Sequence, residues 1–399
     1  MDTTPVHARL WHRDFWLLAI ADLLLTMTVY MVIVMLPQWI CVDRGHDVLD
    51  MVWVVASFAL GLFALGPFCN YFIQVYRRNH VYMVAAFGVA VSFILLALDV
   101  HGILGRHIPF LGLLAVRFSQ GAFFGLAQMV LLSTLAVDVA ESTQRTDANH
   151  ALSWFSRLAM VLGPLAAFEL MRFFGVATLF GVMAGMSLVA MILVSLVKIP
   201  FKAPDEGYSK IGFDRFILAH GLLLFFNTLL FAALVGLLLY TYVSAYCYMM
   251  ILVGFYLALR TSTWFFAKPR SVGRQVVVFL VFAAAYALLL FIDNVLLFRL
   301  SFVFWGFLIG LVTSQVPVLY IRVSQHCQRG TSQSTNFLSW ELGVALGVIL
   351  AVVQQAGSEC FGQHYHVMLS IVILFALFVL FFYFITLPWC SRQHLRDKV

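Results

Sequence analysis

Long apolar runs recur along the whole chain, and this feature restricts the fold more than any other. Charged and turn residues mark off twelve such runs of about 20 residues, each long enough to cross the roughly 30 Å hydrocarbon core of a bilayer. The 399 residues are 63% hydrophobic and 11% charged, whereas roughly a quarter of a soluble domain is charged. A soluble fold has no interior that could bury this much apolar surface. The chain is therefore predicted to be a multi-pass membrane protein.

The predicted spans form two sets of six, separated by the polar segment IPFKAPDEGYSKIG. Backbone groups in hydrocarbon need internal hydrogen bonds, and the runs lack the alternation of barrel strands, so each span is predicted to be an α-helix. The expected fold is all-α and polytopic, with an N-terminal six-helix half (1–198), a cytoplasmic linker (199–213) and a C-terminal six-helix half (214–399). The spans are expected near residues 14–36, 49–72, 80–98, 109–133, 149–171, 175–197, 214–238, 240–259, 275–292, 295–320, 333–354 and 364–388.

Basic residues are distributed unevenly over the predicted loops. With the N-terminus inside, the outer loops carry only Arg44, Arg106 and Arg172, and the other basic loop residues lie on the inner side. Short loops rich in Lys and Arg stay in the cytoplasm. Both termini are therefore expected to be cytoplasmic, in a protein of the cell membrane (the inner, cytoplasmic membrane of a bacterium).

A sequence repeat relates the two halves. Residues 144–167 align without a gap on residues 328–351, at a constant offset of 184, and six of the 24 positions are identical. The identities include a Gln-Arg dipeptide at the start of each segment and the glycines Gly163 and Gly347. Six spans separate the two copies, so both halves cross the membrane in the same direction. Parallel repeats of this kind are typical of transporters whose halves rock about a central site.

Four charged residues lie at span depth, where a charge costs at least about 2.5 to 3.5 kcal/mol on insertion scales. They are Asp22, Arg117, Arg157 and Glu341. Asp22, Arg157 and Glu341 each lie about eight residues from the inner edge of a span, which is ~12 Å at 1.5 Å per residue. The repeat gives Arg157 and Glu341 equivalent positions with opposite charge, so they are predicted to face one cavity from opposite halves.

Two interpretations of these charges stay open. In the first, Asp22 takes up and releases a proton as Arg157 approaches and leaves, and Glu341 binds the solute or a proton. In the second, the charges form static ion pairs that fix the packing of the helices. Arg117 is either functional or a structural arginine bonded to carbonyl groups.

Polar and aromatic residues on the predicted cavity helices are candidate solute contacts. Amides offer hydrogen bonds and indole rings offer stacking surfaces, although large aromatics also fill helix contacts and a lone histidine in a span is more often a packing residue. The candidates are Gln120, Trp154, His220, Asn227, Gln315 and Trp340.

Three segments resemble the major facilitator superfamily, and in particular its bacterial sugar-efflux and drug:proton antiporter branches. RFSQGAFFG (117–125) is similar to an arginine and glycine motif of the family, VLGPLAA (161–167) resembles its antiporter motif through Gly163 and Pro164, and residues 322–347 resemble an efflux-permease pattern. The resemblance covers essentially the whole chain. It implies a twelve-helix fold, alternating access, and a role for Arg117 in proton relay or solute-linked gating.

The loop between the second and third spans departs from the family pattern. The family has Gly, three residues, then Asp and Arg before a basic cluster, whereas this gating loop has Gly66, Asn70 and Tyr71 before Arg77 and Arg78. Asn70 can hydrogen-bond at a helix end, but it cannot supply the charge that the family uses to gate its inner face. The antiporter motif also departs, because Ala167 and Phe168 stand where two glycines are usual.

The sequence shows no nucleophile-base motif, phosphate loop, metal-ligand cluster or basic nucleic-acid-binding stripe. We therefore expect no enzyme activity, no cofactor or metal, and no nucleic-acid partner. The predicted function is secondary active transport of a small solute by alternating access, coupled to protons and directed outward by antiport, in a monomer within the lipid bilayer. A uniporter, an importing proton symporter and a non-transporting scaffold or sensor are the alternatives.

Overall fold

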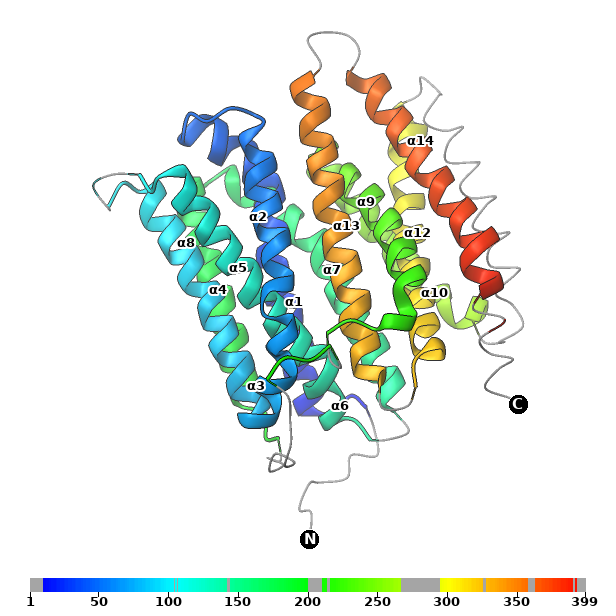
Figure 1. Cartoon of the computed structure of the whole chain (residues 1–399). Helices are drawn as coiled ribbons and strands as arrows, with labels where there is room; N and C mark the ends of the chain where they lie inside the picture. Colours follow the sequence, from blue (N-terminus) through cyan, green and yellow to red (C-terminus); the bar gives the residue numbers. More distant parts are fainter. Residues whose placement is uncertain are drawn as a thin grey trace.

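The computed structural model is a bundle of long helices (Figure 1). It describes residues 10–103, 105, 107–141, 144–199, 210–213, 216–266, 295–325, 328–357, 363–389 and 392. Within these residues, ten helices are long and apolar enough to cross a membrane, and a shorter apolar helix covers Ala245–Thr261. The prediction of an all-α, polytopic fold is confirmed.

The N-terminal helix group contains α1 (Arg13–Leu36), α2 (Asp50–Ala64), α3 (Cys69–Val75), α4 (Arg78–Val100), α5 (Phe110–Val130), α6 (Ala136–Val139), α7 (Arg145–Met171) and α8 (Val176–Ser195). The C-terminal helix group contains α9 (Leu222–Thr241), α10 (Ala245–Phe266), α12 (Val295–Val323), α13 (Arg329–Gly357) and α14 (Gln363–Phe381). The two groups lie beside each other in Figure 1. We call the end of the bundle where α1, α7 and α13 begin the inner side.

Several element boundaries differ from the predicted spans. The span expected at 109–133 continues as a π-helical turn (Leu131–Leu135) and α6, and the span expected at 240–259 begins later, at Ala245. The span expected at 275–292 lies outside the described residues. So does most of the expected linker, and the division of the chain at residues 199–213 stays a prediction.

Helix packing places three helices at the centre of the bundle. Within the N-terminal group, α1 packs against α7 and α8, and α2 packs against α5; in the C-terminal group, α13 packs against α9. The two groups meet where α13 contacts α2 and where α7 contacts α10 and α12. Helices α1, α7 and α13 therefore carry the side chains that reach the boundary between the groups.

The repeat found in the sequence is present in the structure. Helices α7 and α13 begin at Arg145 and Arg329, which are related by the same offset of 184. A Cβ atom on Gly163 would overlap the backbone carbonyl of Met27 in α1, and one on Gly347 would overlap that of Ala233 in α9. Only glycine permits such close approach of two helix backbones. The α1–α7 contact thus recurs as the α9–α13 contact, which confirms two parallel repeats.

Candidate functional site

The carboxylate of Glu341 joins the two helix groups at the centre of the bundle. Its side chain comes from α13 and only 4% of the residue is exposed. The hydroxyl of Tyr30 in α1 donates a hydrogen bond of 2.9 Å to Oε1, and Nη1 of Arg157 in α7 lies 3.5 Å from the same oxygen. One carboxylate oxygen of the C-terminal group is therefore held by two side chains of the N-terminal group. Arg157 and Glu341, which the sequence repeat predicts to face one cavity from opposite halves, lie next to each other.

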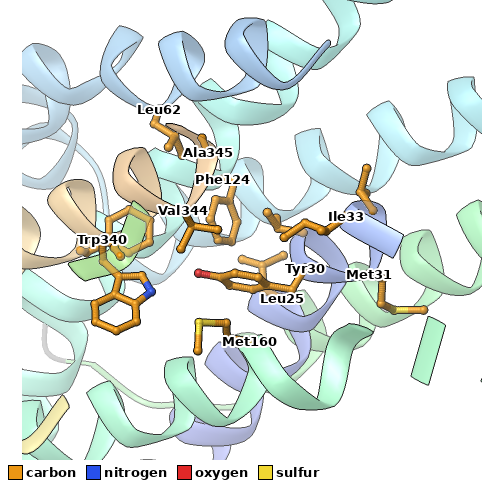
Figure 2. Close-up of a cluster of buried hydrophobic side chains, with 14 of the residues drawn as sticks. Leu25, Tyr30, Met31, Ile33, Leu62, Phe124, Met160, Trp340, Val344 and Ala345 are labelled. Carbon is orange, nitrogen blue, oxygen red and sulfur yellow. The ribbon is translucent and has the colours of Figure 1, made fainter. Parts of the chain in front are cut away.

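Arg157 is buried but loosely held. Its guanidinium carbon lies 3.9 Å from the centre of the Trp340 ring, which is a cation–π contact. Charge-assisted hydrogen bonds usually measure about 2.7 to 2.9 Å, so the 3.5 Å separation from Glu341 is long, and Nη1 has no hydrogen-bond partner within the described residues. Figure 2 shows the indole nitrogen of Trp340 on the side facing the hydroxyl of Tyr30. Arg157 thus has donor capacity that its neighbours leave unused.

Asp22 belongs to a separate hydrogen-bond network inside the N-terminal group. The hydroxyl of Ser156 in α7 donates to Oδ2 at 2.7 Å, and that of Thr26 donates to Oδ1 at 3.3 Å. Thr26 in turn accepts a hydrogen bond of 2.8 Å from the amide of Gln128 in α5. No ion pair joins Asp22 to Arg157 in the part of the chain that is described. The structure therefore places the partner of Arg157 at Glu341 and not at Asp22.

A small cavity adjoins Arg157 at the boundary between the groups. Its volume of about 10 Å³ has room for about one water molecule. It is lined by residues of α7, α12 and α13, namely Ser153, Arg157, Val312, Thr313, Val316, Pro317, Asn336 and Trp340. In this conformation the two groups are closed around the charged residues.

The boundary between the groups changes character with depth. Around the ring of Tyr30 it is apolar, with Ile33, Leu62, Phe124, Val344 and Ala345 in the cluster of Figure 2. Nearer the outer ends of α2, α9 and α13, the hydroxyl of Tyr240 contacts Met51 and donates a hydrogen bond of 2.8 Å to Gln355. Toward the inner side the boundary is polar, and we call the buried residues there the inner polar layer: Ser133, Asn149, Thr331, Ser332, Gln333, Ser334, Thr335 and Asn336. Gly330 of α13 packs directly on the backbone of Ser133 in this layer.

Comparison with known proteins identifies the family. A family model described as Major Facilitator Superfamily matches residues 18–348. The chain belongs to this superfamily. The fold is also that of two solved transporters, although at 13% identity each likeness shows the fold alone. A variant of the E. coli fucose:proton symporter has a TM-score of 0.62, with 94% of this chain and 99% of that chain covered. A bacterial homologue of the human lysosomal transporter Spinster, in an inward-facing and occupied conformation, has a TM-score of 0.65, with 96% and 98% covered.

Curated proteins give no significant match to the chain. Membership of the major facilitator superfamily makes the chain a multi-pass membrane transporter and not an enzyme. The substrate, the coupling ion and the direction of transport do not follow from it.

Arg117 lies apart from the central charges. It is buried near the start of α5, where it donates to Oε1 of Gln120 and lies 4.8 Å from the ring centre of Phe58 in α2. No acidic side chain pairs with it among the described residues. Arg117 and Gln120 therefore form a polar pair at the α2–α5 contact.

The structure gives the predicted solute contacts different surroundings, and two of them, Asn227 and Trp154, serve helix packing. His220 is exposed in the short turn before α9. The amide of Asn227 donates to the carbonyl of Phe378 at 3.4 Å and so joins α9 to α14, and Trp154 packs edge-on against Phe255 at 4.9 Å. The side chain of Gln315 lies outside the described residues. Among these candidates, Trp340 is the one that contacts a central charge, that of Arg157.

The gating loop contacts the C-terminal group through an aromatic side chain. A Cβ on Gly66 would overlap the ring of Phe216, which also lies 6.1 Å from the ring of Phe63. Asn70 accepts a hydrogen bond of 3.4 Å from Gln74 within the loop's own helix. The Phe216 ring therefore packs on Gly66, and Asn70, at the position where the family pattern has an acid, hydrogen-bonds only within its own helix among the described residues.

The basic residues of the loop lie at the start of α4. Arg77 precedes its first residue, and Arg78 forms an ion pair with Asp138 of α6. Both partners belong to the N-terminal group. Arg78 therefore ties α4 to α6 and does not reach the C-terminal group through this ion pair.

The antiporter-like motif supports the central site. Gly163 of α7 lies against the backbone of α1 and would contact Tyr30 if it carried a side chain, so it permits Tyr30 to approach α7. Pro164 lies inside α7 without interrupting it.

Sequence reasoning overlooked Tyr30, Ser156, Thr313 and Asn336. Helical spacing could have revealed Tyr30, because Asp22, Thr26 and Tyr30 recur every four residues and so share one face of α1. No such signal existed for Thr313.

Proposed function

We propose that this chain is a proton-coupled secondary transporter that moves a small solute across the cell membrane by alternating access and exports it by antiport. The observation that carries the proposal is the buried contact between the groups, in which Glu341 of α13 accepts from Tyr30 of α1 and faces Arg157 of α7. A titratable group at this boundary can link proton binding to separation of the groups.

Proton binding to Glu341 would be linked to separation of the two groups by electrostatics. A carboxylate deep in the membrane interior is stable only while charged or polar partners hold it. Protonation of Glu341 would remove its negative charge and its attraction for Arg157, which would weaken the contact across the boundary. Because a ligand shifts a two-state equilibrium by its difference in affinity for the states, a proton on Glu341 would favour the state in which the groups are apart.

We assign the proton-carrying role to Glu341 ahead of Asp22. The hydrogen bonds of Asp22 come from Thr26 and Ser156, both in the N-terminal group, so its protonation would change contacts within that group. The contacts of Glu341 cross the boundary. Asp22 stays a second titratable candidate, because it accepts a hydrogen bond from Ser156, the residue next to Arg157.

The inner polar layer supports alternating access. Ser133 Oγ, Asn149 Oδ1 and Gln333 Nε2 are buried and have no hydrogen-bond partner within the described residues. Native proteins leave few such atoms unpaired, because each costs about 1 to 3 kcal/mol. An alternative state in which water enters from the inner side would satisfy them. The apolar residues around Tyr30 gain nothing from hydration.

Direction, orientation and division into halves are further parts of the proposal. Export by antiport rests on the resemblance of residues 161–167 and 322–347 to antiporter and efflux patterns. The charge distribution of the loops supports a cytoplasmic location of both termini. We take residues 1–198 and 214–399 as the two bodies that rock, joined by residues 199–213.

The test uses purified full-length protein in proteoliposomes, with a solute first selected by thermal stabilisation from a panel of solute classes. We expect a pH gradient to drive accumulation in the wild type, and Glu341→Gln to abolish this drive while solute exchange without a gradient continues. Glu169→Gln is the matched control, because Glu169 pairs with Arg172 at an exposed position of α7. Unchanged gradient-driven transport in Glu341→Gln would refute the role of this carboxylate.

The same assay separates the alternatives by the sign of the gradient effect. An antiporter moves solute against the proton flow, and an importing symporter moves it with the flow. A uniporter equilibrates the solute whatever the gradient. Absence of transport with every solute that stabilises the protein would favour a scaffold or sensor.

A further inference from the structure

The cavity beside Arg157 has a polar wall formed by both helix groups. Ser153 and Arg157 come from α7, Thr313 from α12 and Asn336 from α13, and each is at least nine-tenths buried. The polar wall of this cavity is therefore assembled from three helices and from both helix groups.

The polar groups of this wall have unused hydrogen-bonding capacity. Nη1 of Arg157 and Oγ1 of Thr313 have no hydrogen-bond partner within the described residues. Arg157 is a pure donor, and the hydroxyl of Thr313 and the amide of Asn336 can each donate. Pro317, four residues after Thr313, has no N–H and leaves the Thr313 carbonyl without its usual helical partner. A ligand that brings oxygen atoms to this wall would satisfy groups that are costly to leave unpaired.

The rest of the cavity lining is apolar. It consists of Val312, Val316, Pro317 and the indole of Trp340. Arg157 lies 3.5 Å from Glu341, which is long for a charge-assisted hydrogen bond, so part of its donor capacity stays open to an oxygen acceptor. A cationic solute would meet the guanidinium at close range without a free carboxylate, because the nearest one is already held by Tyr30 and Arg157.

We propose that the cavity lined by Arg157, Thr313 and Asn336 is the subsite for the head of the transported solute, and that this head is an oxygen acceptor, a carboxylate or a hydroxyl, attached to an apolar body that lies against Val312, Val316 and Pro317. The inference rests on the proposed transport function and names its substrate class. The closed cavity of about 10 Å³ has room for about one water molecule, so the head group enters it only as the groups separate.

Three probes with the same phenyl body test the class of head group: benzoate, benzyl alcohol and benzylammonium. Binding to purified full-length protein in detergent is measured by equilibrium dialysis and by the shift of the thermal unfolding midpoint. We expect benzoate or benzyl alcohol to bind and benzylammonium to bind at least ten-fold more weakly. Stronger binding of benzoate identifies a carboxylate head, and stronger binding of benzyl alcohol identifies a neutral hydroxyl head.

The variant Thr313→Val tests whether the probes bind in this cavity. The substitution keeps the shape of the side chain and removes a hydroxyl that has no partner, so the protein should fold as well as the wild type. We expect it to weaken binding of the oxygen-headed probe about five-fold, as the loss of one hydrogen bond does. Thr28→Val is the matched control, because the Thr28 hydroxyl donates to the carbonyl of Leu25 in α1, away from the cavity.

Tighter binding of benzylammonium, binding of no probe, or equal binding by Thr313→Val and the wild type would each overturn the subsite. These results would leave the proposed transport function intact if Glu341→Gln still abolishes gradient-driven transport of the selected solute. Conversely, transport by the wild type that does not respond to the pH gradient would refute the proton coupling. If Thr313→Val still weakened probe binding in that case, the subsite would be supported on its own.

Discussion

At the scale of single residues, two side chains of the N-terminal group share one oxygen of Glu341. Tyr30 provides a hydrogen bond of normal length and Arg157 provides charge at 3.5 Å. Removing one member of a buried ion pair leaves an uncompensated charge, whereas removing both can be nearly neutral. This asymmetry distinguishes a true pair from two neighbouring charges.

We therefore predict that Arg157→Met and Glu341→Leu are strongly non-additive. Each single substitution should lower the free energy of unfolding by about 3 kcal/mol, the cost of an unpaired buried charge, and the double substitution by much less than the sum. The measurement is a double-mutant cycle of denaturant unfolding in detergent micelles. Additive losses would mean that Arg157 and Glu341 do not interact.

The residue scale also shows where sequence reasoning stops. Counting residues from a span edge gives depth along the helix, and it placed Asp22, Arg157 and Glu341 in one layer. It does not give the direction in which each side chain points around the helix axis. Arg157 therefore pairs with Glu341 of the opposite group, while Asp22 is bonded by Ser156, the residue next to Arg157.

At the scale of helices, the close contacts between backbones depend on glycine. Gly163 and Gly347 occupy equivalent places in the two repeats and lie against α1 and α9. Their spacing could be read from the sequence, and so could the apolar length of the spans. The π-helical turn at Leu131–Leu135 and the late start of α10 at Ala245 could not, because local packing decides how a helix ends.

We predict that Gly347→Ala destabilises the protein by about 1 to 3 kcal/mol, the usual cost of forcing extra atoms into a packed contact. The added methyl group would overlap the carbonyl of Ala233, which belongs to the rigid backbone of α9. Gly185→Ala in α8 is the matched control, because no atom lies within 4 Å of the added methyl and alanine favours helix formation. Thermal unfolding of the two variants in the same detergent gives the comparison. Equal midpoints for both would show that α13 can move away from α9 without cost.

At the scale of the whole molecule, the boundary between the groups is asymmetric. The cluster around Tyr30 is apolar, whereas the inner polar layer holds unpaired polar atoms. The sequence predicted two halves facing one cavity, and it could not predict that the groups are closed on each other. A closed and an open state use the same residues, so the pattern of residue types does not distinguish them. The direct packing of Gly330 on the backbone of Ser133 shows that the groups are closed on the inner side.

This asymmetry predicts which side opens. In a chain whose six cysteines are replaced by serine or alanine, a thiol introduced by Ser133→Cys should react with a membrane-impermeant maleimide supplied from the inner side of oriented vesicles. The Ser133 side chain is 3% exposed, so the reaction should be slow while the groups stay closed. Adding Glu341→Gln removes the charge that holds Arg157 across the boundary. We expect it to raise the rate about ten-fold, which corresponds to about 1.4 kcal/mol in favour of the open state.

Ala345→Cys is the matched probe on the apolar side of the boundary, where the native side chain is also buried. Its reaction from the inner side should remain slow in both backgrounds, because separation of the inner polar layer does not require the cluster around Tyr30 to come apart. If the thiol at position 133 reacts only from the outer side, the assigned orientation of the bundle is wrong. If Glu341→Gln leaves its rate unchanged, the contact of Glu341 with Tyr30 and Arg157 does not control the inner side, and the coupling between proton and solute must be sought at Asp22.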